Sequence, residues 1–256
     1  MLDENITVEG SGQPIVFLHG VGLDRQMWTP VITQLKNRYQ CITCDMIGHG
    51  NARMPFGPID LKAFSEDLVD TIKSVVPPRP TLVGFSMGAM VAQRLALDHP
   101  DLIGSLVLSN AVFKRNKFQR AAILERADKV NEEGMSQMVE PAILRWFSPE
   151  FIDRNPVEIN KIRATLLNND LSHYIRAYRV FATADIELAE SIESIRCWAT
   201  IVTGRNDINS TPLMAQEMSD KMTNSKVIIM NGVAHGAPIE APKEFGKIVA
   251  DAMESA

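Results

Sequence analysis

The feature that most constrains the fold of this chain is a serine between two glycines, placed directly after an apolar run and directly before a helical pattern. The run Thr81–Phe85 is short and apolar, which is typical of a buried strand, and the apolar residues after Ser86 recur at helical spacing. A strand can pass into a helix over one residue only through a sharp turn. Gly84 and Gly88 suit that turn because a side chain at either position would collide with the neighbouring strand or helix. We therefore predict a strand, a strained turn that lifts Ser86 from the sheet edge, and a helix.

The segments around this turn alternate between apolar runs and helical periods. Continuous apolar runs are typical of strands covered on both faces, and strands that alternate with helices form a parallel sheet between two helical layers. The predicted strands are Ile6–Glu9, Ile15–Leu18, Gln40–Asp45, Thr81–Phe85 and Leu102–Asn110, and the predicted helices are Gln26–Lys36, Ile59–Val76 and the one after Ser86, with a loop at Pro77–Pro80.

The alternation stops between about residues 113 and 190, where helical patches are separated by prolines and no strand pattern occurs. Two further predicted strands, Cys197–Gly204 and Lys226–Met230, and a closing helix, Pro242–Met253, follow. A chain of 256 residues suits one domain with a small insertion. We predict an α/β core of residues 1–112 and 191–256 with a mostly parallel, doubly wound sheet, and a helical cap of residues 113–190 inserted after the fourth main parallel strand.

Composition and charge exclude several classes of protein. The net charge of −5 provides no basic field for nucleic acid, and no apolar run reaches the roughly 18 residues that a membrane span needs. The first ten residues lack the basic and apolar regions of a signal peptide, so we expect a cytoplasmic protein. Cys41 and Cys44 point to opposite faces of a predicted strand, which suits neither zinc nor a redox pair. We expect reduced cysteines and no metal or other cofactor.

Ser86 is a poor nucleophile unless a base takes its proton, and that base needs an acceptor to orient it. Later strands supply both at their carboxyl ends, because Asp207 follows the run IVTG and His235 follows the run KVIIM. Strand ends of a parallel sheet share one edge, so three distant residues can meet there. Asp207 could instead be a turn aspartate and His235 a surface loop histidine. Asn110 ends an earlier strand but cannot ionise, and we predict a catalytic triad of Ser86, His235 and Asp207.

Attack on a carbonyl carbon also needs donors for the oxyanion that forms, and backbone N–H groups usually provide them. Met87 follows the nucleophile directly, and Val21 lies in the loop after the first long strand. We predict an oxyanion hole made by the backbone N–H groups of Val21 and Met87. His19 and His49 are interpreted as structural loop residues. His173, in the predicted cap, is the other histidine that could contact a substrate.

Five short motifs follow successive predicted strands: HG at 19–20, D-x-x-GHG at 45–50, GFSMG at 84–88, G-x-N-D at 204–207 and AHG at 234–236. Together they resemble the α/β-hydrolase family across nearly the whole chain. The resemblance implies the α/β-hydrolase fold and a serine hydrolase that needs no cofactor.

The predicted cap, with its segment Arg145–Pro149, is most similar to the caps of 3-oxoadipate enol-lactonases and related small esterases. This resemblance implies hydrolysis of a small carboxylic ester or lactone. The chain departs from those lactonases at residues 19–20, where Asn-Ser is frequent, at Ile47, where Arg is usual, and at Asn51, where Ser is usual. The departures leave the particular substrate open.

The wall of a substrate pocket is predicted from the aromatic residues Trp146, Phe147 and Tyr174. Arg115 belongs to a run of positive charges between residues 114 and 120, where the predicted cap leaves the sheet. An arginine there could bind a free carboxylate of a substrate. A charge run is more often a solvated helix face, and we favour that interpretation.

Other functions share this scaffold. A hydrolase that cleaves carbon–carbon bonds of ring-fission diketones uses the same triad, and it ranks second because its longer glycine-rich oxyanion loop is missing. A perhydrolase, an acyltransferase or a ligand-sensing protein that retains a triad are further alternatives. Ser86 excludes dehalogenases and epoxide hydrolases, which need a carboxylate nucleophile. We predict a small-molecule ester or lactone as substrate, no nucleic-acid or membrane partner, and a monomer or small homo-oligomer.

Overall fold

A computed structural model of the chain describes residues 4–75 and 79–255, and within them seven strands form one sheet. Val76, Pro77 and Pro78, at the end of a predicted helix and in a predicted loop, lie outside the described residues. The strand order is β1-β3-β2-β4-β5-β6-β7, and every neighbouring pair is parallel except β1 with β3. The strands are β1 (Ile6–Glu9), β2 (Gln13–Leu18), β3 (Tyr39–Cys44), β4 (Thr81–Phe85), β5 (Ser105–Ser109), β6 (Trp198–Gly204) and β7 (Ser225–Met230).

The central strands are the most deeply buried elements. All five residues of β4 and of β5 are buried, as are the last four of β2, because helices cover both faces of the sheet. The parallel register pairs Leu18 with Gly84 and Phe85 with Ser109, so β2, β4 and β5 end at one edge. The predicted doubly wound α/β fold is confirmed, and its strand ends meet where the chemistry was expected.

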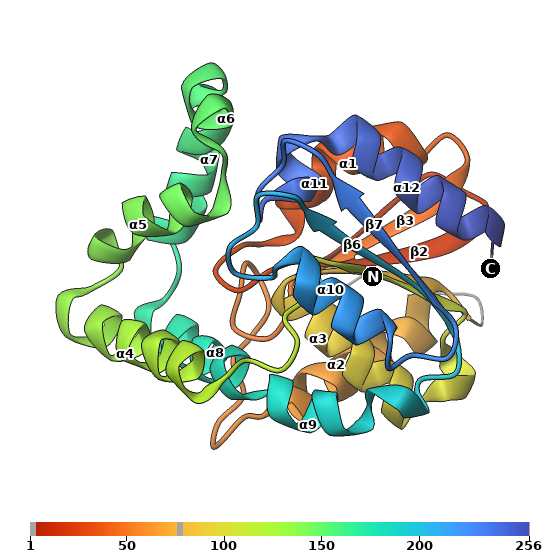
Figure 1. Cartoon of the computed structure of the whole chain (residues 1–256), viewed down its shortest axis with the longest axis horizontal. Helices are drawn as coiled ribbons and strands as arrows, with labels where there is room; N and C mark the ends of the chain where they lie inside the picture. The colour runs from red at the N-terminus through yellow and green to blue at the C-terminus, as the bar shows by residue number, and fades with distance from the viewer. Residues whose placement is uncertain (1–3, 76–78, 256) are drawn as a thin grey trace.

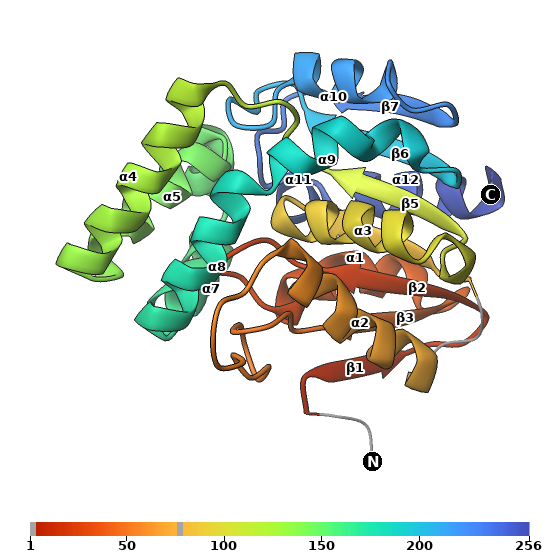
Figure 2. The same cartoon turned by 90° about the horizontal axis from the view of Figure 1, so that it is seen from below.

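Helices cover the sheet in two layers (Figure 1; Figure 2). On one face lie α1 (Thr29–Leu35), α11 (Ala237–Glu240) and α12 (Pro242–Ser255), and on the other lie α2 (Leu61–Val75), α3 (Met87–Asp98), α9 (Asp185–Ser191) and α10 (Pro212–Ser219).

The predicted helix 26–36 is two elements in the structure, a 3-10 turn at Arg25–Trp28 and then α1. Pro30 explains the division, because proline is tolerated in the first turn of an α-helix but not in its interior. Asp24 starts the 3-10 turn by accepting the backbone N–H of Gln26.

Between β5 and β6 the described chain forms helices, and five of them lie beyond the carboxyl ends of the strands, on the left in Figure 1. We call them the α4–α8 segment. Two of them begin with a proline, Pro149 and Pro156. Proline is tolerated there because the N–H groups of the first turn make no hydrogen bond within the helix. The last helix of the predicted insertion, α9, packs against α3 at the face of the sheet. The five helices are α4 (Lys117–Glu133), α5 (Ser136–Trp146), α6 (Pro149–Arg154), α7 (Pro156–Leu167) and α8 (Leu171–Thr183).

Two further sequence features have a clear place in the fold. Cys41 and Cys44 are free and buried in β3, and burial raises the pKa of each thiol to about 12. Both thiols are therefore protonated at neutral pH and unreactive. Among the described residues no helix combines the length and the apolar character needed to cross a membrane.

Candidate active site

The turn at Ser86 has the predicted geometry. β4 ends at Phe85, α3 begins at Met87, and Ser86 between them has φ +52° and ψ −109°. A positive φ is strained for a residue with a side chain, so surrounding structure must hold it. The backbone N–H of Ser86 donates to the carbonyl oxygen of Ser109 on β5 at 2.9 Å. A Cβ on Gly88 would overlap the carbonyl oxygen of Leu18, which explains the glycine after the serine.

The structure brings the three predicted triad residues together. His235 Nε2 lies 3.2 Å from Ser86 Oγ, and His235 Nδ1 lies 2.8 Å from Asp207 Oδ2. Asp207 follows β6 and His235 follows β7, so the shared sheet edge positions both. All three residues are at most 4% exposed. The arrangement allows a proton to pass from the hydroxyl to an imidazole that a carboxylate orients.

The Asp207 carboxylate is fully hydrogen-bonded. Oδ1 accepts the backbone N–H groups of Asn209 and Ser210 at 2.8 and 2.9 Å, and Oδ2 accepts from Asn110 Nδ2 at 2.8 Å as well as from His235. Burial alone would raise the pKa of Asp207, but the adjacent His235 and these hydrogen bonds outweigh burial and lower the pKa below its ordinary value. Asp207 is therefore ionised at neutral pH.

Asn110 is a site residue that the sequence analysis missed. It had been weighed only as an acid, whereas in the structure its amide donates to the same carboxylate oxygen that His235 contacts. Its own orientation is fixed by Ser109 Oγ, which donates to Asn110 Oδ1 at 2.8 Å. The sequence signal that could have identified Asn110 is its position directly after a strand, at the same sheet edge as Ser86.

The loop that carries His235 is tied to the α4–α8 segment. The backbone N–H of Gly236 donates to the carbonyl oxygen of Trp146, at the end of α5, at 2.7 Å. Ser148 Oγ, two residues further on, donates to Glu240 at 2.7 Å. These contacts fix the loop of His235 relative to the helices above it.

His19 and His49 occupy the structural positions expected of them. Both are buried, with ring centroids 5.0 Å apart. His19 Nε2 accepts the backbone N–H of Met46 at 2.9 Å, which links the loop after β2 to the loop after β3. Burial, reinforced by His19, lowers the pKa of His49 to about 3.

We expect the His49 imidazole to make folding sensitive to mild acid. Below pH 6.5 His49 binds a proton in the unfolded state, whereas in the folded state it stays neutral down to about pH 3. The free energy of unfolding therefore decreases as the pH is lowered through that window. Between pH 7 and pH 5 the loss from this residue is about 2 kcal/mol. Urea unfolding at both pH values should give a loss that is about 2 kcal/mol smaller in His49→Gln than in the wild type, because burial also lowers the pKa of His19, which the variant keeps. Equal losses in the two proteins would contradict the assignment.

A cavity of about 210 Å³ lies between Ser86 and the α4–α8 segment. Of the residues predicted for the site, its lining includes Val21, Ser86 and His235, together with Trp146, Tyr174 and Arg115. Phe147 does not line the cavity. The Phe147 ring stacks on Phe151 and fills the space beside Gly236, where a Cβ on residue 236 would overlap the ring. His173 lies on a separate open cleft, and Met87 is buried at the start of α3.

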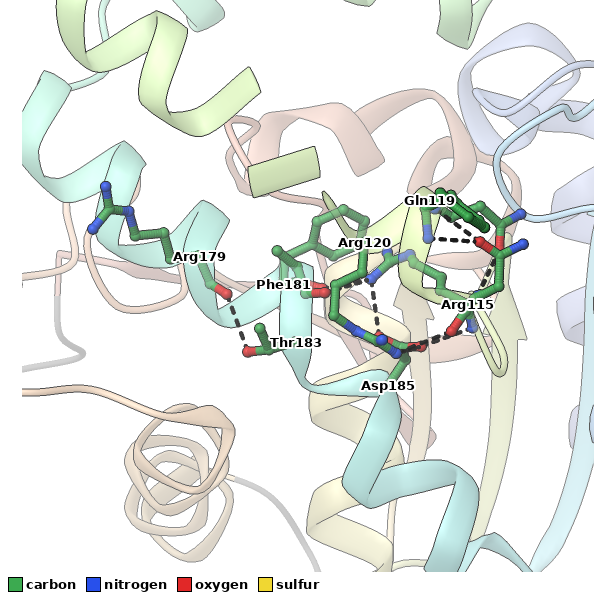
Figure 3. A network of polar contacts seen from close by, with 10 residues as sticks. Arg115, Gln119, Arg120, Arg179, Phe181, Thr183 and Asp185 are labelled. Atoms are coloured by element: carbon green, nitrogen blue, oxygen red, sulfur yellow. Dashed lines mark hydrogen bonds and ion pairs between the residues drawn. The ribbon is translucent and has the colours of Figure 1, made fainter. Parts of the chain in front are cut away.

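The interpretation of the charge run as a solvated helix face is wrong for Arg115. Lys114 and Lys117 are exposed, but the Arg115 side chain is 3% exposed and pairs with Asp185, which also pairs with Arg120 (Figure 3). Arg115 also donates to the carbonyl oxygen of Phe181. Burial lowers the pKa of the Arg115 guanidinium to about 10, so it stays charged at neutral pH.

A doubly wound sheet that carries a serine on such a turn, within reach of an imidazole and a carboxylate, defines a class of α/β enzymes that catalyse hydrolysis. The comparison with known proteins agrees. The chain belongs to the Alpha/beta hydrolase family, whose model matches residues 15–248.

Individual relatives extend over nearly the whole chain. An (E)-2-((N-methylformamido)methylene)succinate hydrolase from Acinetobacter baylyi is 28% identical, over 96% of this chain and 92% of that protein. The 3-oxoadipate enol-lactonase 2 of the same organism is 25% identical, over 94% and 88%. The similarity to enol-lactonase-like proteins that the motifs indicated is confirmed.

Solved structures show the same fold. An enol-lactonase from Burkholderia xenovorans LB400 superposes with a TM-score of 0.88 at 24% identity, covering 96% of this chain and 94% of that one. A thermophilic esterase from Thermogutta terrifontis gives a TM-score of 0.90 at 22% identity, covering 98% and 92%.

Proposed function

We propose that the protein hydrolyses a small carboxylic ester or lactone through an acyl-enzyme on Ser86. The observation that carries the proposal is the continuous set of contacts from Ser86 Oγ to His235 and from His235 to Asp207, at the floor of a cavity. The relatives named as an enol-lactonase and a hydrolase of a succinate derivative support the substrate class.

Each triad residue has one role in this mechanism. As Ser86 Oγ attacks the carbonyl carbon, His235 Nε2 takes its proton, and Asp207 holds Nδ1–H and stabilises the imidazolium. The backbone N–H groups of Val21 and Met87 donate to the oxyanion. His235 then protonates the departing alkoxide, which leaves as an alcohol, or stays tethered to the acyl group if the substrate is a lactone. Water, deprotonated by the same imidazole, releases the acid and regenerates Ser86.

The α4–α8 segment serves as a cap in this proposal. Helices α4, α5 and α8 supply most of the cavity wall, including Ile123, Trp146 and Tyr174. Such a wall excludes water from the oxyanion and so strengthens the hydrogen bonds that stabilise it. The core of residues 1–112 and 191–256 then carries the triad, and residues 113–190 shape the substrate pocket.

A serine-directed phosphonate tests the proposal directly. The reagent should add one phosphonyl group to Ser86, located by peptide mass spectrometry, and should abolish hydrolysis. Ser86→Ala should take up no label. Turnover of a panel of lactones, aryl esters and vinylogous diketones then identifies the bond that is cleaved. Full activity after stoichiometric labelling, or a preference for the diketones, would overturn the assignment.

A further inference from the structure

Glu240 connects the loop of His235 to the α4–α8 segment. It is the last residue of α11, five positions after His235. Its carboxylate Oε1 accepts the backbone N–H of Ala234 at 2.8 Å. Its Oε2 accepts the hydroxyl of Ser148 at 2.7 Å and the backbone N–H of Ser148 at 3.1 Å. Both oxygens of one carboxylate are therefore shared between the histidine loop and the link from α5 to α6.

The backbone N–H groups on both sides of His235 have fixed acceptors. Ala234 donates to Glu240, and Gly236 donates to the carbonyl oxygen of Trp146 at 2.7 Å. One acceptor lies in the link from α5 to α6, and the other is held by Ser148 of that link. The place of the His235 backbone therefore depends on the α4–α8 segment as well as on β7.

The loop of Asp207 contacts the same part of the chain, residues 145–148, which we call the brace. Asn209 donates its backbone N–H to Asp207 Oδ1 at 2.8 Å and its side-chain amide to the carbonyl oxygen of Arg145 at 3.4 Å. The brace thus contacts the loops of both the imidazole and the carboxylate. Trp146 of the brace also lines the cavity, so a substrate bound there would contact the same segment.

We propose that Glu240 is a positioning residue, which couples the brace to His235 and so holds His235 Nε2 within reach of Ser86 Oγ. The proposal rests on the proposed function, in which His235 is the base. Proton transfer depends on the 3.2 Å contact between these two atoms. A displacement of about 1 Å, even one caused far from the reacting atoms, can lower a rate by about 100-fold. A base on a loop therefore needs supporting hydrogen bonds of this kind.

A carboxylate suits position 240 because all three of its partners donate. Glutamine there would still offer one oxygen to the N–H of Ala234, and its NH2 could donate to the hydroxyl of Ser148, which accepts as well as donates. Alanine offers neither contact. Glutamate, glutamine and alanine at position 240 therefore weaken the connection in steps without adding bulk.

Steady-state kinetics of these variants test the positioning role. Glu240→Ala should lower kcat for a short-chain p-nitrophenyl ester by about 10- to 100-fold, with KM changed less than about threefold, because the base is displaced while the cavity wall is intact. Glu240→Gln should lose less. Ser148→Ala, which cuts the connection on the side of the brace, should lower kcat by about three- to tenfold, the equivalent of one hydrogen bond. Adding Ser148→Ala to Glu240→Ala should cause no further loss of kcat, because both act through one connection.

The matched control is Asp60→Ala. Asp60 Oδ1 accepts the backbone N–H of Ala63 at 2.8 Å near the start of α2, away from the cavity lining. Its replacement also removes a carboxylate that holds backbone, so it should lower the unfolding temperature without lowering kcat. A kcat of Glu240→Ala within twofold of the wild type, an equal loss of kcat in Asp60→Ala, or a higher KM at constant kcat would overturn the proposal. If Glu240→Ala does not fold, Ser148→Ala takes its place, and an unchanged kcat in that variant would overturn the proposal.

An NMR measurement separates the positioning role from the proposed function. The Nδ1–H proton of His235, which lies between Nδ1 and Asp207 Oδ2, should exchange slowly with water in the wild type. Its exchange should be faster in Glu240→Ala and unchanged in Asp60→Ala. If the exchange responds in this way while no ester or lactone is hydrolysed, the proposed function fails and the positioning role stands. If esters are hydrolysed and neither kcat nor the exchange rate responds to Glu240→Ala, the positioning role fails alone.

Discussion

Replacing Ser86 with alanine should lower kcat for a short-chain p-nitrophenyl ester by about 10⁴- to 10⁶-fold, as in serine hydrolases whose nucleophile has been removed. The reason is chemical, because within residues 4–75 and 79–255 the hydroxyl that contacts His235 Nε2 is that of Ser86, and its loss removes the group that would form the acyl-enzyme. Initial rates measured by p-nitrophenol release, with circular dichroism to confirm folding, check the result. A variant that keeps more than about a tenth of the wild-type rate would refute the nucleophile.

The same experiment shows whether the three residues work as a unit. Asp207→Asn alone should lower kcat by about 10⁴-fold, since an amide cannot hold the imidazole in the required tautomer. In the double variant with Ser86→Ala, the loss should be no larger than in Ser86→Ala alone, because the base is useless without its nucleophile. Multiplied losses would mean that the two side chains act independently, against the contacts through His235.

The sheet and the meeting of Ser86, His235 and Asp207 were predictable because their signals are local. Each buried strand is a short apolar run, and each reactive residue follows such a run within a few positions. Parallel strands end at a common edge, so Ser86, Asp207 and His235 could be placed together without knowing any long-range contact. Even the strained turn was visible, because Gly84 and Gly88 are required by the close approach of strand and helix.

The residues that could not be predicted depend on partners far away in the chain. Arg115 looks like part of a solvated run because its neighbours are charged, yet its partner Asp185 lies 70 residues further on. Asn110 reads as an inert amide until Asp207, 97 residues away, is seen to accept its hydrogen bond. Phe147 was expected in the pocket, but the space beside Gly236 receives it instead. In each case the local pattern is compatible with two environments.

Asp185→Asn should lower the free energy of unfolding by about 3–5 kcal/mol, a large part of the stability of an ordinary domain. The Asp185 side chain is fully buried and accepts from the backbone N–H of Arg115 at 2.9 Å in addition to pairing with two guanidinium groups. Removing its charge leaves Arg115 charged and buried without compensation, while an amide oxygen still fills the same space. Urea unfolding followed by fluorescence measures the change.

The exposed pair Arg179–Asp128, on neighbouring helices of the α4–α8 segment, provides the matched control. Asp128→Asn should cost less than about 1 kcal/mol, because solvent screens exposed charges and few such pairs stabilise a protein measurably. Adding Arg115→Met to Asp185→Asn should restore part of the lost stability, since it removes the uncompensated charge and keeps an apolar side chain of similar length. A double variant less stable than Asp185→Asn would show that Arg115 stabilises the fold through its packing on Phe181 rather than through its charge. Equal losses of stability for Asp185→Asn and Asp128→Asn would likewise contradict the importance of the buried charge pair.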